Sequence, residues 1–347
     1  MHYILLITAV MLVLIISAAL ITGRFENDLI TRNFYVLGTV VQLKVFGKKA
    51  EKAVDEVINR LNDIDDKMSV FKNFSEISII NDNAGKSMIS VSDDTYKVIK
   101  SAVKYSKLSE GMYDPTVGPL VNLWGIGTDN AAIPNDSEIN KKLKMVNYKD
   151  ILFDDDTFSV MLAQEGQSFD AGGIAKGYAA DEVNKILKKN HIKSAVINLG
   201  GNIFVLGSKV NNKNELWKVG IQNPFDYRGN HVGVINIKNK SIVTSGNYER
   251  YFEYEGKRYH HIIDPKTGYP SESKIVSATI ISDKSIDGDG LSTGVYIMGL
   301  QKAFKLIESL KGIDAIFITN DKKIYCTFGI KDNFKLENYE FIQCDTI

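Results

Sequence analysis

Apolar residues recur at helical spacing in several parts of the chain. A first amphipathic helix is predicted from about residue 50 to Lys67, and a second from the N-cap residue Ser92 to Gly111. Two further helices are predicted over 285–298 and 301–310. The apolar face of the first helix consists of Ala50, Ala53, Val54, Val57, Ile58, Leu61 and Ile64.

Short runs rich in β-branched and aromatic residues predict strands. One strand is expected over 34–47, and two late strands near Ala315 and Ile324. Most runs after Ala195 lie too close together for a crossover helix, so pairing should be largely antiparallel. The mixture predicts an α+β fold with helices packed on antiparallel sheets. The runs after Ala195 read VINLGG, NIFVLG, ELWKVGIQ, HVGVINI, SIVTSG, RYFEYEGKRYHHII and IVSATIIS.

The N-terminus carries an apolar run over residues 4–21, about the length that crosses a bilayer as a helix. Small residues at 17–19 would also suit signal-peptide cleavage, but the usual positively charged region before such a run is missing. We therefore favour an uncleaved anchor. This divides the chain into an anchor or signal segment, a polar tether and one large domain, with bounds 1–23, 24–32 and 33–347.

The charge that follows the apolar run is small. Arg24 and Arg32 alone would place the body of the protein in the cytoplasm. Over all 347 residues, Lys plus Arg and Asp plus Glu both total 42, without a long basic run, which argues against nucleic acid as a partner. Cys326 and Cys344 form no CxxC motif, so a thiolate metal site is unsupported, and a disulfide is allowed but not required.

The stretch SFDAGGIAKGYAAD, residues 168–181, has the composition of an anion site. Asp170 stands where a helix N-cap would, Gly172 and Gly173 allow close approach of the backbone, and Lys176 adds a positive charge in the first turn. Phosphate or pyrophosphate would fit such a helix start. The alternative is a capped helix with a glycine-rich start and a solvated lysine.

The stretch SIDGDGLSTGVYIMG, residues 285–299, has the composition of a cation site. Asp289 and Thr293 are four residues apart at a predicted helix start, with Ser292 between them, so their oxygens share one face. A carboxylate and a hydroxyl suit a hard cation, Mg²⁺ or Ca²⁺. The alternative is ordinary capping by Asp287 or Asp289.

Two further segments are candidates for binding. Residues 111–127 are dense in glycine and proline, and predict either a pocket wall for a flat ring or an extended loop in which Trp124 and Tyr113 cover the core. At the end of a predicted strand, only one of His260 and His261 can face a given site, and that one could act as a general base. No P-loop, dinucleotide-fold, α/β-hydrolase or zincin motif is present.

Six motifs in order give the chain a resemblance to the ApbE family of FAD:protein FMN transferases. They are DPTVGPLVNLWGIG, DAGGIAKGYAAD, INLGGN, VTSGNYERYF, HHIIDPKTGYP and DGLSTGVYIMG. The resemblance implies an ApbE-type, T-fold-like α+β domain and a Mg²⁺-dependent enzyme. Such an enzyme binds FAD as its substrate and moves FMN onto a threonine or serine of an acceptor protein, with release of AMP.

The resemblance also implies roles for individual residues. Asp289, Thr293, the backbone carbonyl of Gly173 and Ser292 would hold the metal. His261 matches the histidine of an H-x-I-D-P motif and, with Lys176 and Asp289, would be catalytic; a nearby carboxylate is the alternative proton acceptor. At Leu37 the family usually has methionine, and leucine keeps the apolar contact with the flavin. With the anion stretch included, the expected FAD contacts are Leu37, Ser69, Ser75 and the residues up to Asn81, Tyr113, Asp114, Pro115, Asp170, Gly172, Lys176, His261 and Ile263.

The same resemblance places the catalytic domain on the extracytoplasmic side of the cell membrane, against the weak charge bias. The expected acceptor is a membrane redox subunit or an FMN-carrying domain. Two alternatives stay open from the sequence. Water could replace the protein hydroxyl, which would give an FAD pyrophosphatase, or the protein could be a membrane-tethered flavin-binding module without catalytic activity.

Overall fold

The computed structural model describes residues 29–209 and 215–344. The predicted anchor and most of the predicted tether lie outside these residues. Within them, no helix combines the length and the apolar character needed to cross a bilayer.

A nine-stranded sheet forms the centre of the domain, in the order β1-β2-β6-β7-β10-β13-β14-β15-β17. Every neighbouring pair is antiparallel except β15 and β17, as expected from the short connections. Its strands are β1 (Leu29–Val36), β2 (Thr39–Phe46), β6 (Ser194–Leu199), β7 (Asn202–Leu206), β10 (Lys240–Gly246), β13 (Ile275–Ser282), β14 (Ile313–Thr319), β15 (Lys323–Cys326) and β17 (Ile342–Cys344).

Three small sheets accompany the large one. One is a hairpin and two have three strands, in the orders β16-β9-β8 and β3-β5-β4. Their strands are β11 (Tyr251–Tyr254) and β12 (Lys257–His260); β8 (Trp217–Gln222), β9 (His231–Ile237) and β16 (Phe334–Leu336); and β3 (Ile89–Ser90), β4 (Ile151–Asp154) and β5 (Ser159–Leu162).

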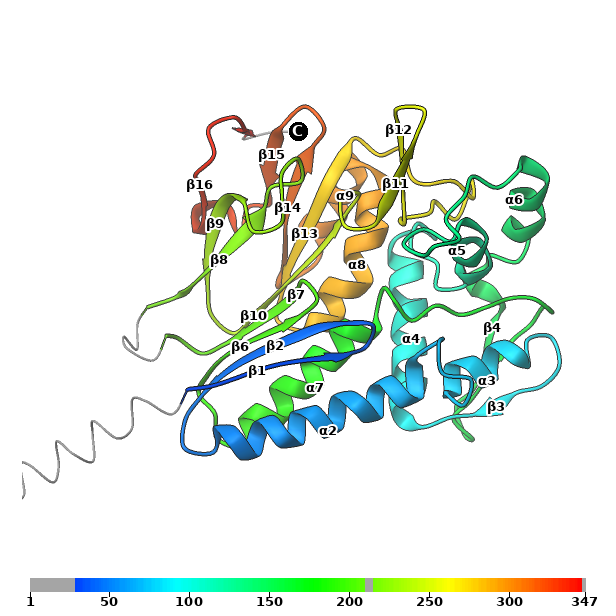
Figure 1. Ribbon diagram of the computed structural model, residues 1–347, viewed down its shortest axis with the longest axis horizontal. Coiled ribbons are helices and arrows are strands. Elements are labelled where there is room, and N and C mark those ends of the chain that lie inside the picture. Colours follow the sequence, from blue (N-terminus) through cyan, green and yellow to red (C-terminus); the bar gives the residue numbers. More distant parts are fainter. Residues whose placement is uncertain (1–28, 210–214, 345–347) are drawn as a thin grey trace, which may run out of the picture.

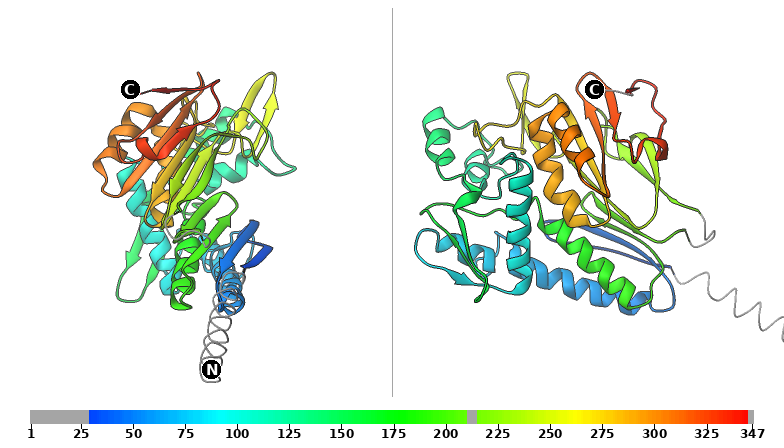
Figure 2. Two further views of the ribbon diagram at one scale, coloured as in Figure 1. Left: turned by 90° about the vertical axis from the view of Figure 1, so that its left-hand side faces the viewer. Right: turned by 180° about the vertical axis from the view of Figure 1, so that it is seen from behind.

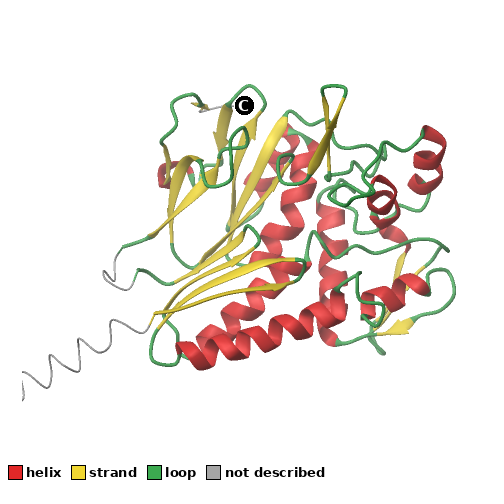
Figure 3. Cartoon of the chain, in the orientation of Figure 1, coloured by secondary structure: helices red, strands yellow, loops and turns green. Residues whose placement is uncertain are grey.

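Helices cover one face of the large sheet, and the views in Figures 1, 2 and 3 agree that α7 and α8 lie against it with α2 beside α7. The helices predicted from periodicity are confirmed, with bounds that differ by at most three residues. The helices are α2 (Ala50–Met68), α3 (Glu76–Asp82), α4 (Asp93–Leu108), α5 (Gly118–Trp124), α6 (Asp136–Leu143), α7 (Ala175–Lys189), α8 (Ser285–Met298) and α9 (Leu300–Ser309).

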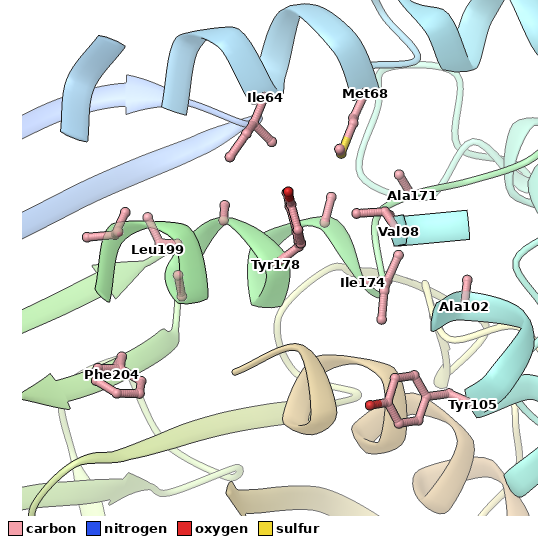
Figure 4. Packing of buried hydrophobic residues seen from close by; sticks show 14 of the residues in the cluster. Ile64, Met68, Val98, Ala102, Tyr105, Ala171, Ile174, Tyr178, Leu199 and Phe204 are labelled. Atoms are coloured by element: carbon pink, nitrogen blue, oxygen red, sulfur yellow. The ribbon is translucent and has the colours of Figure 1, made fainter. Parts of the chain in front are cut away.

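The central strands of the large sheet are buried on both faces, whereas exposed residues alternate with buried or half-buried ones along β1 and β2. Phe204 of β7 belongs to the core between the sheet and the helices, which Figure 4 shows around Tyr178 and Ile174, whereas its neighbour Val205 packs toward β8 and β9. Residues of β13 also alternate between the two cores, so every residue of this strand is buried. A strand covered on both faces reads as one continuous apolar run, as IVSATIIS does.

The predicted single strand over 34–47 is wrong, because the chain forms a hairpin there. Leu37 and Gly38 make the turn between β1 and β2, with φ angles of 54° and 67°. Glycine adopts this region freely, and the strained leucine hid the turn from the sequence pattern. The hairpin also corrects the domain bounds, since β1 starts at Leu29 and includes residues assigned to the tether.

The loop expected over 111–127 contains the helix α5, which begins with Gly118 and Pro119. Proline suits a first helical turn because it has no N–H to leave unpaired. Trp124 is fully buried, and its ring nitrogen donates to the carbonyl of Gly268 at 2.8 Å. The tryptophan therefore belongs to the core, as the plainer interpretation predicted. Cys326 and Cys344 are both free thiols.

An ion-pair network joins the helices α2, α4 and α7. The guanidinium of Arg60 on α2 lies 2.6 Å from Asp94 on α4 and 2.8 Å from Glu182 on α7. Hydrogen bonds from Arg60 hold the pKa of Asp94 well below its ordinary value. The side chains retain only 15–20% exposure, so the charges depend on one another more than a surface pair does.

Replacing Arg60 by methionine should lower the free energy of unfolding by about 1–3 kcal/mol, because Asp94 and Glu182 lose the charged hydrogen bonds of the guanidinium and keep Lys67 and Lys185 as their ion-pair partners. Urea denaturation in detergent measures this. Lys97→Ala is the control, since Lys97 pairs with Asp93 at the surface and its loss should cost under about 0.5 kcal/mol. Equal effects of the two substitutions would contradict a structural role for the network.

Candidate active site

The helices α7 and α8 cross in direct contact at Gly177. A Cβ atom on Gly177 would lie 2.6 Å from the carbonyl oxygen of Ser285 and 2.7 Å from Cβ of Asp289. The N–H of Gly177 donates to Oδ2 of Asp289 at 2.8 Å. The crossing therefore fixes the position of a buried carboxylate that belongs to α8 with a backbone group of α7.

A second carboxylate of α7 holds the start of α8. Asp181 accepts hydrogen bonds from the N–H groups of Ser285 and Ile286, at 2.7 and 3.1 Å. Burial raises its pKa to about 6. The alternative interpretation, capping of this helix by Asp287 or Asp289, is thus wrong, because Asp181 caps it and Asp287 accepts from the hydroxyl of Tyr105.

Asp289 and Thr293 lie one turn apart inside α8, not at its start as predicted, because the helix already begins at Ser285. Thr293 is partly exposed. The hydroxyl of Ser245, at the end of β10, lies 3.2 Å from that of Thr293 and donates to that of Ser292 at 2.8 Å. Ser292 in turn donates to the carbonyl of Asp289. These contacts assemble one carboxylate and three hydroxyl groups.

The loop before α7 lies next to this cluster. Asp170 is not the N-cap of the helix, which starts at Ala175; its Oδ1 accepts from the N–H of Gly172 at 2.7 Å and closes a turn five residues earlier. The amide of Asn81 makes two hydrogen bonds with the backbone of Phe169 and fixes the loop from the side of α3.

Tyr113 packs between the loop and α8. A Cβ atom on Gly173 would lie 2.9 Å from its ring, and one on Gly294 would lie 3.2 Å from its Cβ. Its hydroxyl is buried and has no hydrogen-bond partner among the described residues. Burial, with the charges of Asp289 and Asp170 nearby, raises the pKa of this hydroxyl well above its ordinary value. It therefore stays protonated, as a donor without an acceptor.

Two positive charges, those of Lys176 and Arg250, act on His261. Lys176 donates to the carbonyl of Gly172 at 2.8 Å, and its charge reaches His261. The backbone N–H of His261 donates to the carbonyl of Arg250, and Nδ1 of the ring lies 3.2 Å from the same oxygen. Burial, and then the charges of Arg250 and Lys176, lower the pKa of His261 to about 3.

The two histidines have different surroundings. His260 is the last residue of β12 and is buried, and its Nε2 lies 2.9 Å from the carbonyl of Ser271. His261, the residue chosen from the motif, follows the strand and is affected by the charge of Lys176.

Some predicted cofactor contacts also have clear structural tasks. One carboxylate oxygen of Asp114 accepts hydrogen bonds from its own loop, and the other accepts one from the backbone N–H of Tyr148. Ser75 is buried as the N-cap of α3, and Ser69 follows the last turn of α2. Ile263 belongs to the core around Trp124. The carbonyl of Pro115 accepts from the N–H of Asp170 at 2.7 Å, so this loop positions the anion stretch.

The donor set fits a magnesium ion. Asp289 uses Oδ2 for Gly177, and no hydrogen bond to Oδ1 is found among the described residues. Thr293, Ser292 and the carbonyl of Gly173 would add neutral oxygens, and Mg²⁺ often takes one or two carboxylates and completes its shell with water and phosphate. The residues described here include no group of three or more His, Cys, Asp or Glu side chains that could hold a metal.

Comparisons with known proteins show the family of the chain. The model of the ApbE family matches residues 37–317. A FAD:protein FMN transferase of Klebsiella pneumoniae is 33% identical over 92% of this chain and 99% of its own, and one of Treponema pallidum is 32% identical over 92% of both chains.

Solved structures show the same fold. The ApbE protein of Thermotoga maritima superposes with a TM-score of 0.81 and 32% identity, and the flavin transferase ApbE of Vibrio cholerae with 0.80 and 28%. Each match covers 88% of this chain and 99% of the other. These matches define an enzyme of the transferase class. The chain belongs to the ApbE family.

Sequence reasoning missed several residues that build the site. Ser245 and Arg250 lie within the VTSGNYERYF motif, but no pattern in the sequence assigned them a contact. Gly177 and Asp181 stand inside the anion stretch, where they appear to be ordinary helix residues. Their partners are more than 100 positions away in the chain, at Ser285 and Asp289.

Replacing Gly177 by alanine should destabilise the protein by about 1–3 kcal/mol, because the methyl group would overlap α8. The direction of the change in stability is informative, because a glycine-to-alanine substitution in a solvent-exposed helix raises the free energy of unfolding by up to about 1 kcal/mol. The thermal unfolding midpoint measures the effect, with Lys188→Ala on the exposed face of α7 as control. A raised midpoint for Gly177→Ala would contradict the close crossing.

Proposed function

We propose that the protein transfers FMN from FAD to a threonine or serine hydroxyl of an acceptor protein, with release of AMP and a requirement for Mg²⁺. The observation that carries this is the arrangement around the loop 168–174. A buried carboxylate with one oxygen unused, Asp289, bonds to Gly177 of α7, next to the cation Lys176, and the charges of Lys176 and Arg250 act on His261. The names of the relatives supply FAD, FMN and the protein acceptor.

The proposed reaction is a displacement at phosphorus. The acceptor hydroxyl oxygen forms a bond to the phosphorus on the riboflavin side, the phosphoanhydride bond breaks, and AMP leaves with the bridging oxygen. A bound Mg²⁺ would supply charge neutralisation for the diphosphate. Lys176 is suited to hold the same negative charge, whereas the N–H groups of Ala175 and Gly177 already donate to the carbonyl of Ala171 and to Asp289. Positioning and charge stabilisation dominate such reactions.

His261 is the proposed acceptor of the hydroxyl proton. Its low pKa keeps the imidazole neutral at pH 7, so it can accept a proton, but it makes the ring a weak base in the free enzyme. Two of the causes are the charges of Arg250 and Lys176. A bound diphosphate would offset these charges and raise the pKa toward the useful range.

The proposed site of action is the extracytoplasmic side of the cell membrane, with residues 1–23 as the anchor. This rests on the apolar run of the sequence and on the family resemblance. The proposed acceptor is a membrane redox subunit or an FMN-binding domain, whose hydroxyl must reach the loop between Asp289 and Lys176.

Asp289→Asn should reduce flavin transfer by about 10²-fold or more, because the amide cannot neutralise a cation as the carboxylate does. The fold should persist, since the amide oxygen can still accept from Gly177. Asp287→Asn is the matched control, two residues away but bonded to Tyr105. The assay mixes protein, FAD, Mg²⁺ and acceptor, and reads covalent flavin fluorescence on the acceptor band together with AMP.

A chelator should abolish the signal, and added Mg²⁺ should restore it. Full activity of Asp289→Asn would refute the proposed metal site. AMP formation at an equal rate with and without acceptor, and no fluorescent acceptor band, would instead identify a pyrophosphatase.

The pKa of His261 makes stability depend on pH. The unfolded imidazole binds a proton near pH 6.5 and the folded one only near pH 3, so the unfolded state binds more protons between these values. Between pH 7 and pH 5 this residue alone should lower the free energy of unfolding by about 1–2 kcal/mol. His261→Asn should remove that part of the pH dependence, as measured by urea denaturation. An unchanged slope would show that His261 is solvated in the folded state.

A further inference from the structure

The sequence limits how far the domain can sit from its proposed anchor. Seven residues, 22–28, separate the end of the apolar run from Leu29, where β1 begins. Fully extended, they span at most about 25 Å. The end of the domain where β1 starts must therefore lie near the membrane surface. This step rests on the proposed anchor.

The ends of three strands and two helices meet at that end of the domain. Leu29 pairs with Phe46 at the end of β2, and Phe46 pairs with Ser194 at the start of β6. The start of α2 and the end of α7 are tied together there, since the amide of Asn190 donates to Glu56 at 3.0 Å. Figure 1 shows both helix ends beside the start of β1.

This end, which we call the basic end, is rich in lysine. Near it stand three carboxylates, Glu51, Asp55 and Glu56, and Glu51 pairs with Arg32. With Arg24, Glu26 and Asp28 of the adjoining sequence counted, eight cations against five carboxylates give a net charge of +3, although the whole chain has a formal charge of zero. The cations of the basic end are Arg32 and the exposed lysines Lys48, Lys49, Lys52, Lys188, Lys189 and Lys193.

The stability of α2 does not account for this charge. Lys49 is the N-cap of α2 and makes no capping hydrogen bond, and Lys52 lies in its first turn. Cations are unfavourable at a helix N-terminus because of the helix dipole. The lysines Lys188 and Lys189 do suit the end of α7, but they add their charge to the same surface.

We propose that the basic end rests on a membrane surface that contains anionic lipid. Clustered lysines next to a membrane anchor are attracted by anionic headgroups, at roughly five-fold in binding per lysine. The anchor supplies proximity, and the charge selects which face of the domain meets the lipid. Two attachments restrict rotation of the domain about its tether.

The orientation sets the height of the active site. The helix α7 runs from the loop of the site at Ala175 to the basic end at Lys189, and its 15 residues span about 22 Å. The reactive hydroxyl of a membrane-bound acceptor should then stand roughly 20–30 Å above the bilayer surface. An acceptor whose hydroxyl lies close to the bilayer would not reach the site.

Lysine acetylation tests this orientation with the full chain in vesicles. The chain is reconstituted in phosphatidylcholine, with or without phosphatidylglycerol, and acetylation rates are read by mass spectrometry. Lys49, Lys188, Lys189 and Lys193 should react several-fold more slowly with phosphatidylglycerol present, and about 0.5 M salt should abolish the difference. Lys141 on α6 and Lys302 on α9 are exposed internal controls whose rates should not change. Equal rates at the basic end in both lipids would overturn the proposal.

Charge reversal provides the functional comparison. The triple variant Lys188→Glu, Lys189→Glu, Lys193→Glu should lose the lipid-dependent protection, while the control Lys141→Glu keeps it. Transfer to a soluble acceptor in detergent should be equal in both variants and in the unaltered protein. Absence of transfer by the unaltered protein would refute the proposed function, but it would leave the acetylation rates, and so the proposed orientation, unaffected. Release of the chain from vesicles by alkaline wash would overturn the anchor and this inference together.

Discussion

The contact between α7 and α8 at Gly177 is the constraint on which the site depends. It brings the backbone of one helix within hydrogen-bond distance of Asp289 on the other. A side chain at Gly177 would separate the helices and displace the carboxylate. Asp181 then fixes the start of α8 from the same helix. One crossing thus sets both the position and the direction of the helix that carries Asp289 and Thr293.

The composition of α8 follows from its place at the centre of the domain. It packs against α7, against Tyr105 of α4 and against the sheet. Glycines stand where these neighbours come closest, so that a Cβ on Gly290 would overlap the Tyr105 ring and one on Gly288 would lie 2.9 Å from Val243. These glycines lower the helix propensity of α8, but they allow its neighbours to approach the helix backbone closely. Tertiary packing supplies the stability that the sequence of the helix lacks.

Charge is arranged on two length scales. At the site, the carboxylate of Asp289 bonds to Gly177 of α7, and the cations Lys176 and Arg250 act on His261. Across the domain, α7 joins this site to the basic end. The chain has no net charge, so it is the separation of charge, and not its total, that can orient the protein.

The sequence by itself determined the long elements and the family of the site. Helix α2 follows from periodicity and α4 from periodicity and its N-cap Ser92, and ordered motifs named the loop, the metal candidates and His261. The structure alone decided the hairpin at Leu37, the true start of α7, and the partners of Gly177, Asp181 and Ser245. Those contacts join residues distant in the chain, and a local pattern carries no information on which distant group meets a given atom. The periodicity of apolar residues shows that one face of a helix is buried. The site depends instead on how the buried faces of α7 and α8 pack against each other.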